Sequence, residues 1–306
     1  MPFCGWGYTV EDAGRPEQLD HQLASVADAG YTHAEINPQD WDVFHGAKLV
    51  RENLDRFAPI ATRYRDRLRY AMHGPFHINL FHLEEIERGE RVLRAGVEVA
   101  AALGASVMVY HPGYRLKPPA QAGTPMQVLL EREREVLRRV ADAGAPHGVE
   151  IAIETMLPYG EWTYYYAVWP EQLARQVEAI DHPGVGVCID FGHLYQFARW
   201  YGFDVVEGAG LLAPWTNHFH VQDLFGITTA DEDVAETGAG DLHLPPGWGE
   251  IPFDEIFMAV DFPRSPIFNV ELWGTRFLPH RAAILDDIKR LARLRDQSLA
   301  LSLIHI

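Results

Sequence analysis

Short apolar runs alternate with longer amphipathic segments along the chain. The runs are rich in β-branched and aromatic residues, which is typical of β-strands, and the segments between them repeat their apolar positions with a helical period. The predicted strands are Phe3–Tyr8, Thr32–Ile36, Leu68–His73, Ser106–His111, Glu150–Glu154, Gly184–Asp190, Asn217–Gln222 and Ile267–Leu272. This alternation predicts the α/β class and, within it, a closed parallel (β/α)8 TIM barrel.

The segments between the strands are long enough for the right-handed crossovers that join parallel strands. Helices are predicted at Pro16–Ala29, Lys48–Asp66, Leu83–Leu103, Met126–Ala143, Pro170–Ile180, Asp204–Leu212, Phe253–Val260 and Pro279–Arg295. Gly30, Gly104 and Gly148 follow such segments at positions that suit a left-handed helix C-cap.

A single barrel domain is expected over residues 1–297, because α/β barrels commonly run to about 250 residues or more as one domain. Residues 298–306 read SLALSLIHI and form a C-terminal tail of unknown role. A docking segment and a continuation of the last helix are both compatible with this apolar sequence.

Six of the predicted strands carry, at or near the carboxyl end, a residue that binds metals or transfers protons. These residues are His73, His111, Glu154, Asp190, His220 and Glu271. A lone buried histidine is usually a hydrogen-bonded core residue, and a lone carboxylate often caps a helix. In a barrel, however, the carboxyl ends of the strands meet at one face, and so many ionisable groups would be costly to bury without a neutralising cation. The pattern therefore predicts a metal site.

Two local spacings add further candidate ligands. In the sequence from Asp190 to His193 the aspartate ends a strand and the histidine follows as the chain turns into a helix, so both can face one cavity. Asp241 and His243 are two residues apart, which places both side chains on one side of an extended segment. Mixed carboxylates and imidazoles suit Zn, Mn or Co, whereas Mg favours oxygen ligands. A divalent ion from this group is expected, and its identity is left open.

The balance of charged residues limits which classes of binding partner are expected. Lysine and arginine number 26 against 43 aspartates and glutamates, giving a formal net charge of −17. This charge argues against a broad basic surface for nucleic acid. None of the lysines lies at a predicted strand end, so a Schiff-base mechanism has no obvious candidate. The metal-ligand residue types must carry the chemistry.

No segment of the chain has the pattern of a targeting or membrane sequence. The start, MPFCGWGYTV, lacks a basic stretch before an apolar one, and no run approaches the ~18 apolar residues of a membrane span. A cytoplasmic protein is expected. Cys4 and Cys188 fall in strand-like runs, where reduced, buried thiols are the ordinary interpretation.

Several residues near the strand ends are candidates for substrate contact. Trp6 and Trp248 could stack on the apolar face of a sugar ring, although core packing explains a single tryptophan equally well. Glu35 could hydrogen-bond a substrate hydroxyl or form a salt bridge, and His73 and His111 could contact substrate in place of a metal.

The motifs around these residues resemble those of a known superfamily. HGPF at 73–76, YHPG at 110–113, AIET at 152–155, CIDFGH at 188–193, HFHVQD at 218–223, GWGEI at 247–251 and VE at 270–271 carry the likeness. They resemble the xylose-isomerase-like TIM barrel superfamily, which joins sugar isomerases and epimerases to the apurinic endonuclease IV group. The likeness runs from Met72 to Glu271 and is specific for the superfamily, less so for the reaction.

The resemblance to the epimerases implies one metal, held by Glu154, Asp190, His220 and Glu271. Glu154 and Glu271 would then exchange a proton with a sugar or keto-polyol through a metal-stabilised enediolate, with His193 as a proton-shuttling partner. This is the leading hypothesis: a metal-dependent isomerase or epimerase with a small carbohydrate substrate. Assembly as a homo-oligomer is compatible with it.

Other functions remain open. A lyase or dehydratase would use the same enolate, and a carbohydrate-binding protein could hold a structural metal. Resemblance to the endonucleases would recruit a three-zinc cluster for phosphodiester hydrolysis, with ligands His73, His111, Glu154, Asp190, His193, His220, Asp241, His243 and Glu271. Two departures bear on this choice. His220 is followed by no early arginine, unlike in typical ketose epimerases, and the loops LPYGEWTYYYAVW and GITTADEDVAETGAG are aromatic or acidic, which suits a polyol better than DNA.

Overall fold

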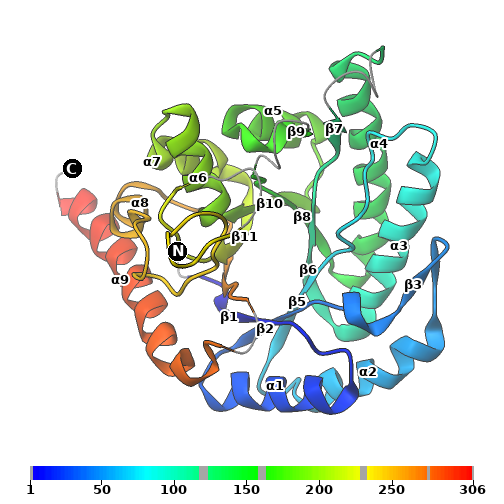
Figure 1. Ribbon diagram of the computed structural model, residues 1–306, viewed down its shortest axis with the longest axis horizontal. Helices are drawn as coiled ribbons and strands as arrows, with labels where there is room; N and C mark the ends of the chain where they lie inside the picture. The colour runs from blue at the N-terminus through cyan, green and yellow to red at the C-terminus, as the bar shows by residue number, and fades with distance from the viewer. Residues whose placement is uncertain (1–2, 117–122, 158–162, 228–232, 274–275, 305–306) are drawn as a thin grey trace.

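Eight parallel strands close into a barrel surrounded by helices, as the sequence predicts (Figure 1). The computed structural model describes residues 3–116, 123–157, 163–227, 233–273 and 276–304. Around the barrel the strands are β1 (Gly5–Val10), β12 (Ile267–Val270), β11 (Thr216–Val221), β10 (Val185–Asp190), β8 (Glu150–Glu154), β6 (Ala105–Tyr110), β5 (Arg69–His73) and β2 (His33–Ile36). Every neighbouring pair is parallel, and β1 closes the barrel against β12.

Helices cover the outside of this barrel. They are α1 (Pro16–Asp28), α2 (Arg51–Arg63), α3 (Ile86–Leu103), α4 (Met126–Gly144), α5 (Pro170–Ile180), α6 (Phe191–Tyr201), α7 (Val205–Leu212), α8 (Phe253–Ala259) and α9 (Arg281–Ile304). Two small antiparallel hairpins lie in loops: β3 (Phe44–His45) with β4 (Lys48–Leu49), and β7 (Tyr114–Leu116) with β9 (Thr163–Tyr165). Among the described residues, no helix is both long and apolar enough to cross a membrane.

Four local predictions need correction. Lys48 belongs to the hairpin strand β4, so the second helix begins at Arg51, and the third begins at Ile86 rather than Leu83. The periodicity predicts no helix where α6 lies, because the residues from Phe191 to Ala198 are all buried and show no polar face. Cys4 precedes β1 and is exposed, whereas Cys188 is buried as expected.

The C-terminal tail continues the last helix. Helix α9 runs without a break through Ile304, which agrees with one of the two interpretations of residues 298–306. The left-handed caps predicted at Gly30, Gly104 and Gly148 also occur, with φ of 91°, 74° and 70°. In each case glycine avoids the steric cost that a Cβ atom would carry there.

The barrel interior is narrow and lined by small side chains. One cluster of buried residues fills it: Ala71, Val107, Val109, Ala152, Cys188 and Ile267. A Cβ atom at Gly7 would come within 2.6 Å of the Asn269 Oδ1 atom, so glycine is needed where β1 faces β12. The larger apolar residues pack outside the barrel against the helices. Space for chemistry is therefore left only at the ends of the barrel.

A buried carboxylate on α4 holds the end of β6 in place. Glu133 accepts hydrogen bonds from the Tyr110 hydroxyl (3.0 Å), the Gly113 amide (2.7 Å) and the Gln176 side chain (3.0 Å). Burial raises the pKa of the Glu133 carboxyl, and these donated bonds oppose the rise. Tyr110 and Gly113 flank His111, so Glu133 fixes the backbone from which that histidine projects.

Replacing Glu133 with alanine is expected to destabilise the protein by about 3–5 kcal/mol, because several buried donors would lose their acceptor. Glu133→Gln keeps a side-chain oxygen acceptor and should cost clearly less. Urea unfolding of both variants and the parent protein measures the difference. A change within about 0.5 kcal/mol for Glu133→Ala would contradict this role.

Candidate metal centre

The nine candidate ligands gather at the carboxyl-terminal end of the barrel and form three adjoining groups. The central group consists of Glu154 on β8, Asp190 on β10, His220 on β11 and Glu271 directly after β12. The His220 Nδ1 atom lies 3.2 Å from Glu154 Oε1, 3.1 Å from Glu271 Oε2 and 3.9 Å from Asp190 Oδ2. One potential ligand atom from each of the four residues falls within 4.8 Å of the others, so a single cation could contact all four.

Two flanking groups adjoin the central one. The first flanking group is His73, His111 and Glu154, and the second flanking group is His193, Asp241 and His243. In the first, His111 Nε2 is 3.0 Å and His73 Nε2 is 3.7 Å from Glu154 Oε2. Glu154 therefore belongs to both the central and the first flanking group, through different oxygens.

In the second flanking group, the Asp241 Oδ2 atom lies between two imidazoles. His193 Nε2 is 3.2 Å and His243 Nε2 is 3.0 Å from that oxygen. The Gln222 amide links this group to the central one, since its Nε2 atom donates to Asp241 Oδ1 at 2.7 Å and to Asp190 Oδ1 at 3.3 Å.

The histidines are oriented in the manner of metal ligands. The Nδ1 atoms of His73, His193 and His243 lie at 3.0, 2.8 and 3.1 Å from backbone carbonyl oxygens. For His220 the arrangement is reversed, because its Nε2 atom faces Glu35. With a metal bound, the nitrogen that faces an oxygen acceptor would keep its proton, and the other nitrogen would offer its lone pair to the ion. Such an outer hydrogen bond is the usual support of a metal-bound imidazole.

A cation fits the polar atoms that these groups bury. Asp190 Oδ2 is buried and has no hydrogen-bond partner among the residues that the structure describes. Asp190 and His220 are fully buried, and Glu154 is nearly so. Carboxylates gathered in this way repel one another unless protons or cations neutralise them. Carboxylate and imidazole donors together suit a divalent ion such as Zn, Mn or Co.

The pKa shifts follow from the same crowding. Burial alone would raise the pKa of Glu154, but His220 and His111 hold it well below its usual range. Burial raises the pKa of Asp190 to about 7, against a lowering by His193. Burial alone would lower the pKa of His243, yet Asp241 raises it to about 9. Without a metal, protons therefore occupy part of the site at neutral pH.

Of the two alternatives given for Glu35, its contacts agree with the ion pair. Glu35 is fully buried beneath the central group, where it lies 2.6 Å from His218 Nε2 and 3.1 Å from His220 Nε2. It is therefore shielded from a substrate and instead orients His220. Sequence reasoning missed His218 and Gln222 as members of this network. The two-residue spacing of His218, His220 and Gln222 on one strand was the available signal, because it places all three on one face.

The predicted aromatic contacts are also revised. Trp6 lies near the amino end of β1 and packs against Phe3 and Phe268 on the outside of the barrel, so it does not reach the ligand groups. Trp248 is exposed and contacts Phe277 and His280. Other rings cover the ligands instead.

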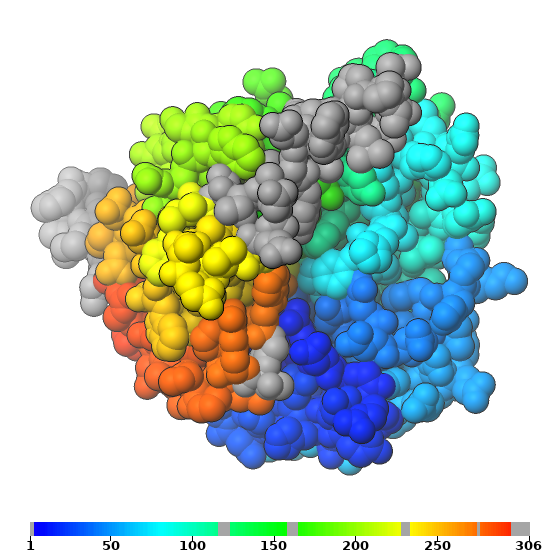
Figure 2. Space-filling model, viewed as in Figure 1, coloured from blue at the N-terminus to red at the C-terminus, as the bar shows by residue number. Residues whose placement is uncertain are grey.

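Phe76 and Trp273 are the rings that cover histidines of the flanking groups. Phe76 stacks on His73 with ring centroids 4.1 Å apart, and Trp273 stacks on His243 at 4.4 Å. Figure 2 shows the face that carries the loops after the strands, where the yellow segment near residue 240 lies beside the orange segment near residue 270.

The predicted shuttle role of His193 has little support in this geometry. Its Nδ1 atom bonds the Thr155 carbonyl oxygen at 2.8 Å and its Nε2 atom faces Asp241. Both nitrogens are thus engaged, and a ligand role in the second flanking group is the better interpretation.

Binding of Zn²⁺ should release protons and weaken as the pH falls. Asp190 and His243, with pKa values of about 7 and about 9, hold more protons in the metal-free fold than isolated side chains would, and a metal must displace them. We expect the affinity to fall by up to about tenfold per pH unit for each displaced proton below those values. Calorimetric titrations at pH 6 and pH 8, each in two buffers of different ionisation enthalpy, measure both effects.

A control variant for this titration is His182→Gln, since His182 pairs with Asp142 outside the ligand groups. It should leave the proton release unchanged. Equal affinity at both pH values, with no protons released, would show that the ligand groups are already deprotonated.

Comparison with known proteins places this site in a family. The model of the xylose isomerase-like TIM barrel family matches residues 23–294. A probable endonuclease 4 of Lysinibacillus sphaericus is 29% identical over 198 residues, which cover 63% of this chain and 62% of that protein. The chain thus spans less than two thirds of this relative's length.

Solved structures share the same architecture. A D-tagatose 3-epimerase-like protein aligns with a TM-score of 0.69 at 19% identity, covering 96% of this chain and 99% of its own. A xylose isomerase-like TIM barrel protein from Mycobacterium smegmatis, in complex with magnesium, aligns with a TM-score of 0.66 at 17% identity, covering 96% and 97%. At these identities the likeness concerns the fold. Since the family model covers most of the sequence, the chain belongs to the xylose isomerase-like TIM barrel family.

Proposed function

We propose that this protein is a metal-dependent isomerase or epimerase of a sugar or keto-polyol, which moves a proton at the carbon next to the substrate carbonyl. The observation that carries the proposal is the placement of Glu154 and Glu271 in one ligand group. Both carboxylates lie beside the same His220 nitrogen, at 3.2 and 3.1 Å. In the barrel, β10 and β11 separate the strands from which they project, so they approach from different sides.

Two carboxylates on different sides of one bound substrate offer both a base and an acid. Burial alone would raise the pKa of Glu271, but His220 and His243 lower it, and the pKa of Glu154 is also low. Both are therefore ionised at neutral pH, and either can accept a proton from carbon. The carboxyl group that has taken this proton can return it to the neighbouring carbon, which gives isomerisation. For epimerisation, the opposite carboxylate would first take a proton from water and then deliver it to the other face of the same carbon.

The ligands of the central group would hold a divalent ion. Bound there, it would polarise the substrate carbonyl and stabilise the negative charge of the enediolate. Glu35 keeps the His220 ring in the required tautomer, and the Gln222 amide holds Asp190 in place. A lyase or dehydratase would begin from the same enediolate and differ only in the group that leaves.

The surroundings of the ligands support a small polyol. Phe76 and Trp273 cover His73 and His243 with aromatic rings, which suit the apolar faces of a sugar. The formal net charge of −17 opposes the approach of a polyanion. The sugar-epimerase name of the tagatose 3-epimerase-like neighbour fits the same proposal.

Phosphate-ester hydrolysis is the second candidate, and the two flanking groups favour it. Together with the central group they offer places for three ions, joined by the shared carboxylate of Glu154. Closely spaced ions are typical of sites that hydrolyse phosphate esters. The likeness to a probable endonuclease 4 supports this candidate as well.

Solvent hydrogen exchange tests the leading proposal. With Mn²⁺-loaded protein in deuterated water, a panel of ketoses, keto-inositols and sugar acids should include a substrate that gains deuterium next to its carbonyl. Proton NMR follows the loss of that signal. Turnover in which the original hydrogen is fully retained would rule out proton transfer by Glu154 and Glu271.

Paired variants separate the two candidates. Glu271→Gln in the central group should lower isomerase turnover by about 10³-fold or more, since it removes a base, whereas His243→Ala in the second flanking group should cost about tenfold or less. Metal content by elemental analysis accompanies both measurements. Three zinc ions per chain, with cleavage of abasic-site DNA that both variants abolish, would establish the hydrolase instead.

A further inference from the structure

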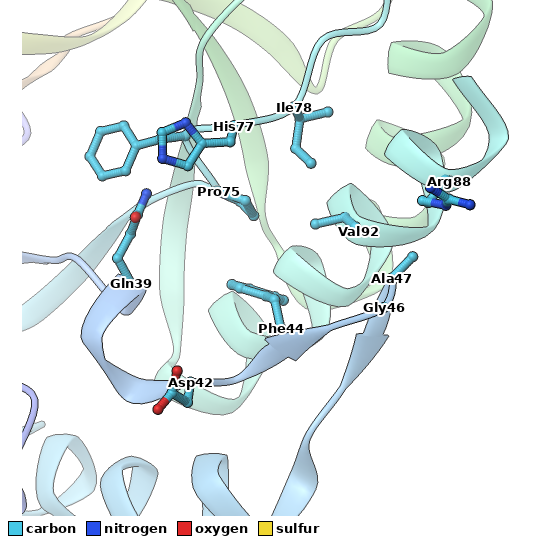
Figure 3. A pocket seen from close by; sticks show the side chains of 11 residues that line it. Gln39, Asp42, Phe44, Gly46, Ala47, Pro75, His77, Ile78, Arg88 and Val92 are labelled. Carbon is cyan, nitrogen blue, oxygen red and sulfur yellow. The ribbon is translucent and has the colours of Figure 1, made fainter. Parts of the chain in front are cut away.

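A separate pocket opens beside the first flanking group. It has a volume of about 380 Å³ and lies between the β3–β4 hairpin, the loop that follows β5 and the start of α3 (Figure 3). This volume is at the lower end of the range for small-molecule sites. None of the nine candidate metal ligands lines the pocket.

The walls of the pocket are largely apolar. Phe44 comes from the hairpin, Pro75 and Ile78 from the loop after β5, and Val92 from α3. Figure 3 shows the Gln39 side chain extending toward the His77 ring at one end, whereas Asp42 points away from it. A flat apolar group would therefore find packing on several sides, with Gln39 and His77 at one end of the pocket and Arg88 at the other.

Phe76 connects this pocket to the ligand groups. Its ring lines the pocket and also stacks on His73, with the ring centroids 4.1 Å apart, and it approaches the His111 ring at 5.1 Å. His73 and His111 belong to the first flanking group, which shares Glu154 with the central group. Phe76 thus lies between the pocket and the first flanking group, which adjoins the central group.

We propose that the pocket binds an aryl substituent carried by the substrate, so that the natural substrate is an aryl-substituted sugar rather than a free monosaccharide. This inference rests on the proposed function for the reacting sugar, and on the pocket for the substituent. Two phenylalanines and a proline offer faces for an aromatic ring. The Gln39 amide and the His77 imidazole could donate hydrogen bonds to oxygens on that ring.

Binding of two glycosides that differ only in their substituent tests the inference. Phenyl β-D-glucopyranoside should bind the Mn²⁺-loaded protein at least about tenfold more tightly than methyl β-D-glucopyranoside, because only the phenyl ring fills the apolar pocket. Proton NMR titration gives both affinities. Saturation transfer from the protein should be strongest on the phenyl protons.

Substitutions in the wall of the pocket test whether the preference for the phenyl glycoside arises there. Val92→Asp introduces a charge into the pocket and should reduce the phenyl-to-methyl ratio to about twofold or less, and Ile78→Asp should act in the same way if Val92→Asp fails to fold. Val128→Asp is the matched control, since Val128 is a partly exposed valine on α4, outside the pocket. It should keep the full ratio. Equal binding of the two glycosides by the parent protein, or a ratio that survives both wall variants, would overturn the inference.

The same protein samples distinguish this inference from the proposed function. The wall residues are not candidate metal ligands, so the preference for the phenyl glycoside should persist after chelation. A phenyl preference together with turnover that fully retains the original hydrogen would refute the proposed reaction and leave the pocket assignment standing. Deuterium exchange without a phenyl preference would refute the pocket assignment alone.

Discussion

The mutual repulsion of buried carboxylates is the constraint on which the site depends. Glu154, Asp190, Asp241 and Glu271 are held within a short distance of one another at one end of the barrel, with little access to water. Imidazoles lie between them. Burial still raises the pKa of Asp190 to about 7, so the charged form of this carboxyl group remains disfavoured. The barrel can hold this arrangement because its strands and its helical shell pack around an extensive apolar core.

Hydrogen bonds outside the ligand groups decide which atoms face a cation. Backbone carbonyl oxygens fix His73, His193 and His243, and the buried carboxylate of Glu35 fixes His220. Because each ring has one nitrogen engaged in this way, the other nitrogen is oriented before any ion binds. The orientation thus comes from backbone carbonyls just past the strand ends and from one buried carboxylate, which hold the rings in place.

The carboxyl-terminal end of the barrel holds both the ligand groups and the surfaces that could contact the rest of a substrate. Under the proposed function, the central group would supply a pair of carboxylates for proton transfer, and the flanking groups add imidazoles that Phe76 and Trp273 cover. Beyond Phe76, the loop after β5 and the β3–β4 hairpin form an apolar pocket. The ligand groups lie at or near the strand ends and the pocket is built mainly from loops, so the two are held by different parts of the fold.

The fold and the gathering of the candidate ligands at one end of the barrel could be predicted from the sequence because both depend on local patterns. Strand and helix periods indicate a barrel, and a residue such as Glu154 or Asp190 at the carboxyl end of a strand must reach the active face. Residue type then indicates a metal. Their sharing of one site follows from topology alone, since parallel strands end on the same face.

Only the tertiary structure decided which residues meet. The alternation of side chains along β1 directs Trp6 outward, and the closure of the barrel brings Glu35 on β2 under His220 on β11. The separation into three ligand groups and the pocket beyond Phe76 likewise depend on the closure of the barrel and on loops that are distant in sequence. Pairing across a barrel is set by strand register and side-chain direction, which a pattern of residue types along one strand does not specify.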